Sequence, residues 1–224
     1  MSSNSTKTLE SMSQAVWYNQ WTVKKFESFL KGDILEVGCG IGNFTLFLKK
    51  YGNVRAIDIN ENYLKQSAEG GLKIGFGDIE KGKYFFGDQK FDCIVCLNVL
   101  EHISNDRAAI KNIAGLLKKD GNLILLVPAH PQLYGAIDES IGHYRRYTKE
   151  KVVNLIEENN LKIVKIRRLN FLGAIGWFIS GRIFKNEKVS SFNIACFNLI
   201  SPLLLLEDIY EPPFGTSILA VAKK

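Results

Sequence analysis

Three glycines at alternating positions, Gly38, Gly40 and Gly42, directly follow a short apolar run that contains Glu36. Glycines let the backbone pass close to a ligand that a Cβ atom would push away. Asp58 ends the next apolar run, twenty residues after Gly38. A carboxylate at that place can accept both hydroxyl groups of an adenosine ribose. The spacing therefore predicts a cofactor that contains adenosine, bound where two neighbouring strands end.

Two later segments carry suitable side chains at corresponding places. Residues 75–80 follow a third apolar run and contain Asp78 and Ile79, which suit an adenine amino group and the face of its ring. Residues 96–103 follow a fourth run and read Cys-Leu-Asn-Val-Leu-Glu-His-Ile. The glycine turn and Asp58 fit NAD and S-adenosylmethionine equally, whereas the two later segments favour S-adenosylmethionine.

With these four segments in this order, the chain resembles the class I S-adenosylmethionine-dependent methyltransferases, and within them the small-molecule and lipid branch. The similarity covers roughly residues 30–160 and the last predicted strand. It implies a Rossmann-like α/β fold with a seven-stranded, mostly parallel sheet of order 3-2-1-4-5-7-6 and helices on both faces. It also implies S-adenosylmethionine as cofactor and S-adenosylhomocysteine as product. The glycine spacing departs from the GxGxxG pattern of dehydrogenases.

The resemblance also assigns a role to each cofactor-side residue. The expected contacts are Glu36, Gly38, Cys39 and Gly40 for the methionine part, Asp58 and Ile59 for the ribose, Asp78 and Ile79 for the adenine, and Asn98 and Val99 around the sulfonium. Tyr18 is expected over the cofactor, with simple packing as the alternative. Glu101 is expected to start a helix, His102 to have a structural or cofactor-side role, and none of these positions to bind metal.

The substrate side is expected in residues 128–147, which follow the fifth predicted strand and hold two of the three histidines. Ligands of parallel α/β folds bind outside the carboxyl ends of the strands. His143 is the candidate general base because an imidazole can accept a proton near neutral pH. The alternative is that His143 and Arg146 only fasten this loop to the domain. The predicted substrate contacts are His130, Tyr134, Arg146 and Tyr147.

Alternating strand and helix patterns must position these residues. The predicted strands are Asp33–Val37, Val54–Asp58, Leu72–Gly77, Phe91–Leu97, Asn122–Pro128, Leu161–Leu169 and Ser217–Ala222. The predicted helices are Ala15–Leu30, Gly42–Lys50, Glu61–Ala68, Arg107–Leu117 and Lys149–Asn159. Strands that are apolar almost throughout are typical of sheets buried on both faces, and the alternation favours parallel pairing with right-handed crossovers.

We expect one domain over residues 1–224, with a cover helix in residues 1–30 and an apolar helical insert or lid in residues 170–213. The apolar stretches of the insert are shorter than the roughly 18 residues of a spanning helix. The core, a second copy of the chain, a lipophilic substrate or a membrane surface could each cover its apolar face. A peripheral membrane contact and a homodimer contact therefore both stay open.

Charge and cysteine content narrow the possible partners and the cellular location. The net charge is +6, but the basic residues are scattered, which disfavours a nucleic-acid partner such as the substrate of an RNA methyltransferase. Four cysteines in apolar or turn contexts indicate free thiols and a cytoplasmic protein. The preferred function is methylation of a hydroxyl or carboxylate on a small or lipophilic acceptor. The alternatives are a non-catalytic S-adenosylmethionine-binding scaffold and an NAD-dependent dehydrogenase.

Overall fold

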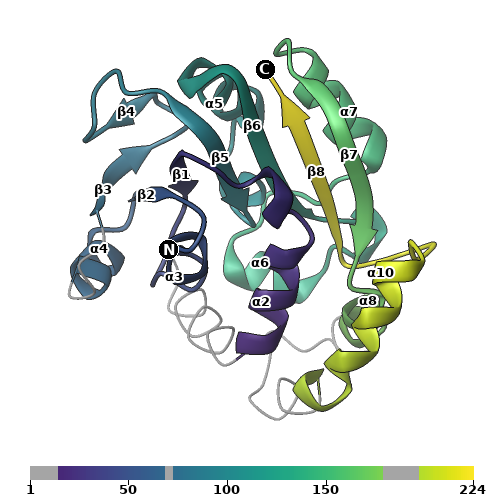
Figure 1. Cartoon of the computed structure of the whole chain (residues 1–224). Coiled ribbons are helices and arrows are strands. Elements are labelled where there is room, and N and C mark those ends of the chain that lie inside the picture. The colour runs from purple at the N-terminus through teal and green to yellow at the C-terminus, as the bar shows by residue number, and fades with distance from the viewer. Residues whose placement is uncertain (1–14, 69–72, 179–196) are drawn as a thin grey trace.

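A computed structural model describes residues 15–68, 73–178 and 197–224, and it confirms the predicted Rossmann-like α/β class. One open sheet runs through the molecule in the order β4-β3-β2-β1-β5-β6-β8-β7 (Figure 1). The strands are β1 (Asp33–Val37), β2 (Asn53–Asp58), β3 (Lys73–Asp78), β4 (Lys83–Tyr84), β5 (Phe91–Leu97), β6 (Leu117–Pro128), β7 (Lys162–Leu169) and β8 (Ser217–Lys223).

The described sheet has eight strands, so the predicted count of seven is wrong. The additional strand, β4, has two residues and pairs antiparallel with the edge strand β3. Two residues are too few to show an alternating pattern in the sequence. The central strands pair in parallel, and β8 lies antiparallel between β6 and β7. The carboxyl ends of β1, β2 and β5 therefore meet at one edge of the sheet.

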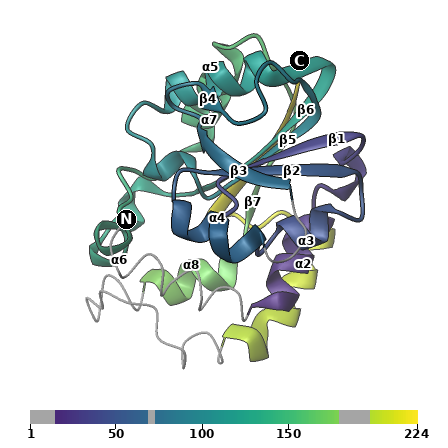
Figure 2. The same cartoon turned by 90° about the vertical axis from the view of Figure 1, so that its left-hand side faces the viewer.

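Both faces of the sheet are covered, which explains why the central strands are apolar throughout. Adjacent residues of β1 illustrate this, since Ile34 packs into one hydrophobic cluster and Leu35 into the other. Helices α5 (Asp106–Leu116) and α7 (Lys149–Glu157) cover one face, whereas α2 (Val16–Lys24) and α3 (Thr45–Leu48) cover the opposite face (Figures 1 and 2). Helix α4 (Glu61–Ala68) packs beside β2 and β3.

Several predicted boundaries were wrong. The predicted N-terminal helix ends at Lys24 and is followed by a separate 3-10 turn, η1 (Glu27–Phe29). Strand β6 begins at Leu117 rather than at Asn122 because Leu117 already pairs with Phe91 across a register irregularity. The short helix α6 (Ala136–Ile141) was not predicted. Thr148 caps α7, since its side chain accepts the Lys151 N–H at 3.2 Å.

The described parts of the predicted insert form α8 (Phe171–Trp177), the 3-10 helix η5 (Ser201–Leu205) and α10 (Leu206–Ile209). The buried Glu207 carboxylate fastens them together by accepting the N–H groups of Asn170 and Phe171, both at 2.9 Å. Residues 1–14 and 179–196 lie outside the described residues, so the extents of the cover helix and of the insert stay predictions. None of the described helices combines the length and the hydrophobicity needed to span a bilayer.

Candidate active site

The turn after β1 brings the first two β-α units together. The N–H groups of Gly38 and Cys39 both donate to the Ile57 carbonyl in β2, at 2.7 and 3.1 Å. Gly38 has a φ of +72°, and a Cβ atom built on it would lie 2.4 Å from Val99 Cγ2. Glycine is therefore required by both the backbone conformation and the close approach of Val99. Val99 follows β5, so the ends of β1, β2 and β5 form one cradle.

Asp58 holds the same cradle from the end of β2. Its side chain is buried, and it accepts the Gly40 N–H at 2.9 Å through Oδ2 and the Asn60 N–H at 2.8 Å through Oδ1. Each carboxylate oxygen has more than one lone pair, so both oxygens can still accept a hydrogen bond from a ligand hydroxyl. Burial raises the pKa of Asp58, while the two backbone N–H groups oppose that shift. The Asp58 carboxylate, which is predicted to bind the ribose, is thus held in a fixed orientation.

Glu36 is the least satisfied residue of the cradle. It is 3% exposed, and its Oε2 has no hydrogen-bond partner within the described residues. Burial, with a smaller effect of the Asp58 charge, raises the pKa of Glu36 to about 8. A buried carboxyl oxygen without a partner costs free energy unless a ligand satisfies it. The ammonium group of a methionine moiety has the charge and the donors to do so.

The other predicted cofactor contacts differ in how far their side chains are exposed. Ile59 is 56% exposed beside a shallow pocket of about 320 Å³ that is also lined by Asn60, Glu61 and Asn62. Asn98 is exposed, has a φ of +54° and donates its N–H to Leu126. Asp78 accepts the Lys81 N–H at 3.0 Å, which fixes a turn. Ile79 is 4% exposed and packs in the core, and its contact with an adenine ring stays a prediction.

Tyr18 packs against its own helix and against the predicted insert. Its ring stacks on Trp21 and meets the edge of Phe197, and its hydroxyl accepts a hydrogen bond from the Asn170 side chain at 3.3 Å. Asn170 and Phe197 both belong to the predicted insert. These contacts support the packing alternative over the predicted cofactor contact, and they join the N-terminal helix to the insert.

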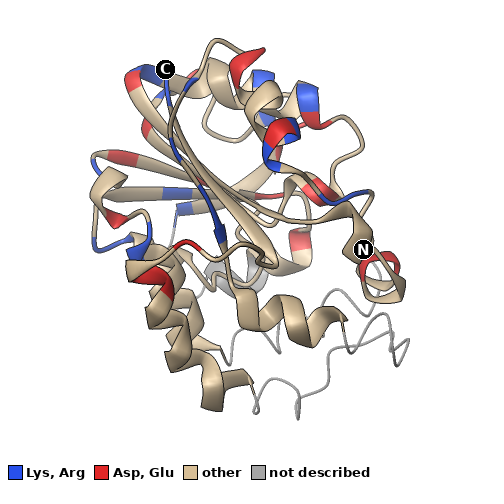
Figure 3. Ribbon diagram, turned by 90° about the vertical axis from the view of Figure 1, so that its right-hand side faces the viewer, with Lys and Arg blue, Asp and Glu red and all other residues tan. Residues whose placement is uncertain are grey.

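A second pocket lies beyond the carboxyl end of β6, with a volume of about 360 Å³. His130 lines it from the loop after β6, and helix α8 contributes apolar side chains opposite. The complete lining is His130, Gln132, Leu133, Ala174, Ile175, Phe178 and Phe214. Helix α8 contains no charged residue, and the ribbons below the sheet carry few charges (Figure 3). The pocket suits an apolar molecule, and it includes one of the four predicted substrate residues.

The other three predicted substrate residues make contacts within the fold, and their substrate roles stay predictions. Tyr147 is completely buried, and its hydroxyl lies 3.2 Å from the Leu100 carbonyl and 3.1 Å from Asp106 Oδ2. These contacts favour a role of Tyr147 in the core, and its substrate contact stays a prediction. Tyr134 donates its hydroxyl to the His143 carbonyl at 2.8 Å. Arg146 is 4% exposed, donates to Asp138 and to the Ala129 carbonyl, and lies over the Trp177 ring.

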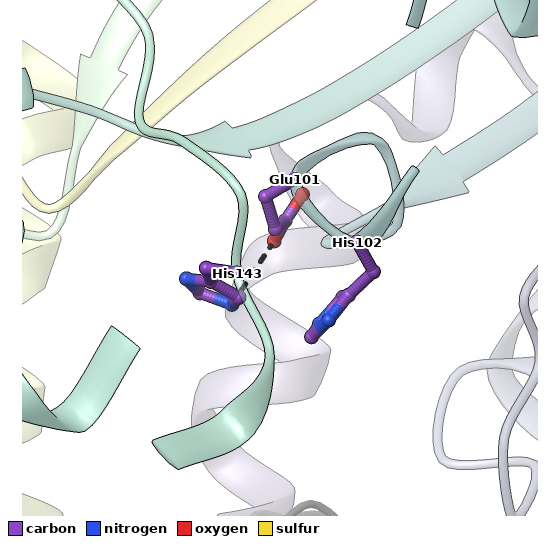
Figure 4. A group of neighbouring side chains, drawn as sticks. All are labelled: Glu101, His102 and His143. Atoms are coloured by element: carbon purple, nitrogen blue, oxygen red, sulfur yellow. Dashed lines mark ion pairs between the residues drawn. The ribbon is translucent and has the colours of Figure 1, made fainter. Parts of the chain in front are cut away.

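His143, the predicted general base, has both ring nitrogens facing carboxylates. Its Nδ1 lies 2.7 Å from Asp138 Oδ1, and its Nε2 lies 3.9 Å from Glu101 Oε1 (Figure 4). The His102 ring meets it edge to face, with 4.6 Å between ring centroids. The His143 side chain is only 8% exposed. The arrangement supports the loop-fastening alternative, and the role of a base stays a prediction.

Glu101 and Asp138 are the residues that sequence reasoning missed. Glu101 lies in the first turn of a short 3-10 helix, η2 (Leu100–His102), but its side chain is 1% exposed and its Oε2 has no partner among the described residues. Burial raises the pKa of Glu101 to about 7 and lowers that of His102 to about 4. Asp138 is five residues before His143 and fully buried. The sequence shows the acids near the histidines but not that the chain folds them into one cluster.

Known proteins share both the sequence pattern and the fold. A family model described as a methyltransferase domain matches residues 35–125. An uncharacterised protein of Methanocaldococcus jannaschii is 31% identical over 153 residues, which span 68% of this chain and 65% of that protein. Ubiquinone biosynthesis O-methyltransferase of Rickettsia prowazekii is 25% identical over 198 residues, which span 76% of this chain and 77% of that enzyme.

The solved structure of the N-methyltransferase NodS from Bradyrhizobium japonicum, in complex with S-adenosylhomocysteine, superposes on this chain with a TM-score of 0.58. The two sequences are 18% identical, and the match covers 92% of this chain and 84% of NodS. At that identity, the superposition shows a shared fold. The matched family segment begins inside β1 and ends inside β6, so it contains the whole cradle formed by the ends of β1, β2 and β5.

Proposed function

The chain belongs to the class I S-adenosylmethionine-dependent methyltransferases, and we propose that it methylates a small lipophilic acceptor bound in the pocket between β6 and α8. S-adenosylmethionine is the cofactor of this family, and its sulfonium group supplies a methyl group that is already activated. The protein then contributes binding, alignment and the exclusion of water.

The observation that carries the proposal is the apolar lining of the pocket of about 360 Å³. Pockets of this size usually bury most of a small ligand, and a few polar groups set its orientation. Here His130 and Gln132 are the polar residues of the lining, whereas Leu133, Ile175 and Phe178 supply apolar surface. A strongly charged or highly polar acceptor would lose its hydration here without sufficient compensation.

The cofactor cradle fits the methyl donor on independent grounds. The unpartnered Glu36 Oε2 suits the ammonium group of the methionine part, and Asp58 is held ready to accept ribose hydroxyls. We propose these two carboxylates as the main polar contacts with the cofactor. Because β5 and β6 are neighbours in the sheet, the acceptor pocket lies on the side of β5 away from β2.

We propose an oxygen acceptor, either a hydroxyl or a carboxylate. A carboxylate needs no base, whereas a hydroxyl must lose its proton during the transfer. Ubiquinone biosynthesis O-methyltransferase among the relatives supports the oxygen acceptor. The likeness to an N-methyltransferase keeps an amine as the second candidate.

Methyl transfer from labelled S-adenosylmethionine into a cell extract tests the proposal. The reaction mixture is separated into lipid and aqueous fractions after incubation with the full chain. We expect label in the lipid fraction and release of S-adenosylhomocysteine in step with it. Label confined to the aqueous fraction would overturn the lipophilic acceptor. Tight cofactor binding without transfer to any fraction would favour the non-catalytic scaffold.

A further inference from the structure

Three side chains that could bind a metal ion meet beneath the carboxyl end of β5. Glu101 and His102 come from η2, and His143 comes from the loop after α6 (Figure 4). One potential ligand atom from each residue lies within 4.8 Å of the other two. Two imidazoles and one carboxylate form a ligand set that transition-metal ions use when coordination positions remain open for water or substrate.

The spacing within the cluster suits an ion better than a direct contact. Glu101 Oε1 and His143 Nε2 are 3.9 Å apart, which is too long for a hydrogen bond. Two ligands at about 2.0–2.1 Å from a tetrahedral ion are about 3.4 Å apart. A small inward movement of either side chain would therefore bring this pair to the spacing of two ligands of one ion.

Both histidines are oriented as metal ligands usually are. Asp138 Oδ1 lies 2.7 Å from Nδ1 of His143, and the Gly142 carbonyl lies 3.3 Å from Nδ1 of His102. An acceptor at Nδ1 places the ring proton there and leaves the lone pair on Nε2. Metal-binding histidines almost always have such an acceptor at the second nitrogen. Arg146 donates to the same Asp138 oxygen at 2.9 Å and thereby fixes the carboxylate.

Glu101 gives an independent indication of a missing partner. Its side chain is 1% exposed, and Oε2 accepts no hydrogen bond from the described residues. Most buried polar atoms in native proteins have a partner, so an oxygen without one needs an explanation. A cation bound at Oε1, between Glu101 and the histidines, would neutralise the buried carboxylate that carries this oxygen.

We propose that Glu101, His102 and His143 bind one divalent transition-metal cation. This departs from the expectation drawn from the family resemblance, which gave these positions no metal role. The site lies beside the cofactor cradle, because η2 directly follows Val99, which packs on Gly38. The inference does not depend on the proposed acceptor, since it concerns binding of the ion alone.

Metal titration of the full chain tests the site without any methyl acceptor. The protein is treated with a chelator, dialysed, and titrated with Zn²⁺ by calorimetry and with Co²⁺ by absorption spectroscopy. We expect one equivalent of either ion and a cobalt spectrum without a strong thiolate band. A wild-type chain that binds no ion, or binds it with a thiolate band from its cysteines, would overturn the proposal.

The third histidine of the chain provides a matched control. We expect Zn²⁺ binding to weaken by at least about tenfold in each of the ligand variants His102→Gln, His143→Gln and Glu101→Gln. The control variant His130→Gln should bind Zn²⁺ as the wild-type chain does. Asp138→Asn should weaken binding about 10- to 100-fold through loss of the acceptor at His143 Nδ1. Circular dichroism verifies that each variant is folded. Wild-type affinity in the folded His102→Gln variant would contradict the proposal, even if the His143 variants fail to fold.

Discussion

The Asp58 carboxylate accepts the Gly40 N–H at 2.9 Å and so joins the turn after β1 to the end of β2. The contact holds a buried acidic side chain next to the glycine turn in the protein without ligand. A preformed arrangement of this kind lowers the cost of ordering the site when a ligand binds.

Gly38→Ala should destabilise the chain and weaken cofactor binding. A left-handed conformation costs a residue with a Cβ atom roughly 1–2 kcal/mol, and the new Cβ would lie 2.4 Å from Val99 Cγ2. Urea denaturation and calorimetry with S-adenosylmethionine measure the two effects. Adding Val99→Ala should restore part of the loss, because the steric conflict is shared between the two positions. Strictly additive effects would show that the two residues are not coupled.

Glu36 should make both stability and cofactor affinity depend on pH. Its pKa is about 8 in the folded protein against a reference value of 4.5. The folded state therefore binds more protons than the unfolded state between these values, so stability falls as pH rises from 4.5 to 8. Glu36→Gln should flatten that slope, which denaturation midpoints at several pH values would reveal. An unchanged slope would contradict the assignment.

Because of Glu36, cofactor affinity should rise with pH, whereas the stability of the free protein should fall. A ligand ammonium group favours the ionised carboxylate, so binding at pH 7 should release a proton and should tighten as the pH rises towards 8. Calorimetry in two buffers of different ionisation enthalpy measures the proton release. The release should disappear in Glu36→Gln. Equal apparent enthalpies for the wild-type protein in both buffers would exclude a buried, protonated Glu36 at this site.

Ile175→Asp should impair acceptor use and spare the cofactor. Ile175 lines the apolar pocket, where a carboxylate would oppose the binding of a lipophilic acceptor. We expect kcat/KM for a lipophilic acceptor to fall by about tenfold or more, with an unchanged Kd for S-adenosylmethionine. Ile209→Asp is the control, because Ile209 is 90% exposed and lies outside the pocket lining. Similar losses in both variants would show that the pocket is not the acceptor site.

Tyr147→Phe separates a role in the core from a role in substrate binding. The hydroxyl contacts the Leu100 carbonyl and Asp106 within a fully buried environment. Its removal should lower the free energy of unfolding by about 1 kcal/mol. The KM for the acceptor should not change. A raised KM with unchanged stability would restore the contact that the sequence predicted.

The sheet was largely predictable because its central strands are buried on both faces. Runs such as Phe91–Leu97 are apolar throughout, and the alternation with helices then favours parallel pairing. The start of β6 was missed because Lys118, Lys119 and Asp120 are polar. Asp120 also has a φ of +63°, which interrupts the extended backbone between Leu117 and Asn122. Strand β4 was missed because it is only two residues long.

The site was predictable only where its residues follow one another along strand ends. Gly38, Asp58 and Val99 each follow an apolar run, and the structure brings them into one cradle. The cluster of Glu101 and His143 joins residues 42 positions apart through a loop whose path no local pattern specifies. Tyr147 was wrongly expected to be accessible. Its polar neighbours in the sequence suggested an exposed loop, whereas its ring is in the core.

Asp58→Asn should weaken S-adenosylmethionine binding by about tenfold or more, because hydrogen bonds to a charged acceptor contribute roughly 1.5–3 kcal/mol. Asp88→Asn serves as the control, since Asp88 is exposed and precedes the amino end of β5, whereas the cradle is formed by carboxyl ends of strands. Equal affinities in the two variants would remove Asp58 from the cofactor site. Thermal unfolding without ligand checks that the substitution has not disrupted the turn at Gly40.

Calorimetric titration of the wild-type chain with S-adenosylmethionine, S-adenosylhomocysteine and NAD, each in a separate experiment, tests the central claim most directly. The cradle formed by the ends of β1, β2 and β5 should bind one molecule of either sulfur compound, and NAD should produce no heat of binding. Saturable binding of NAD, or no binding of both sulfur compounds, would contradict the assignment of this cradle.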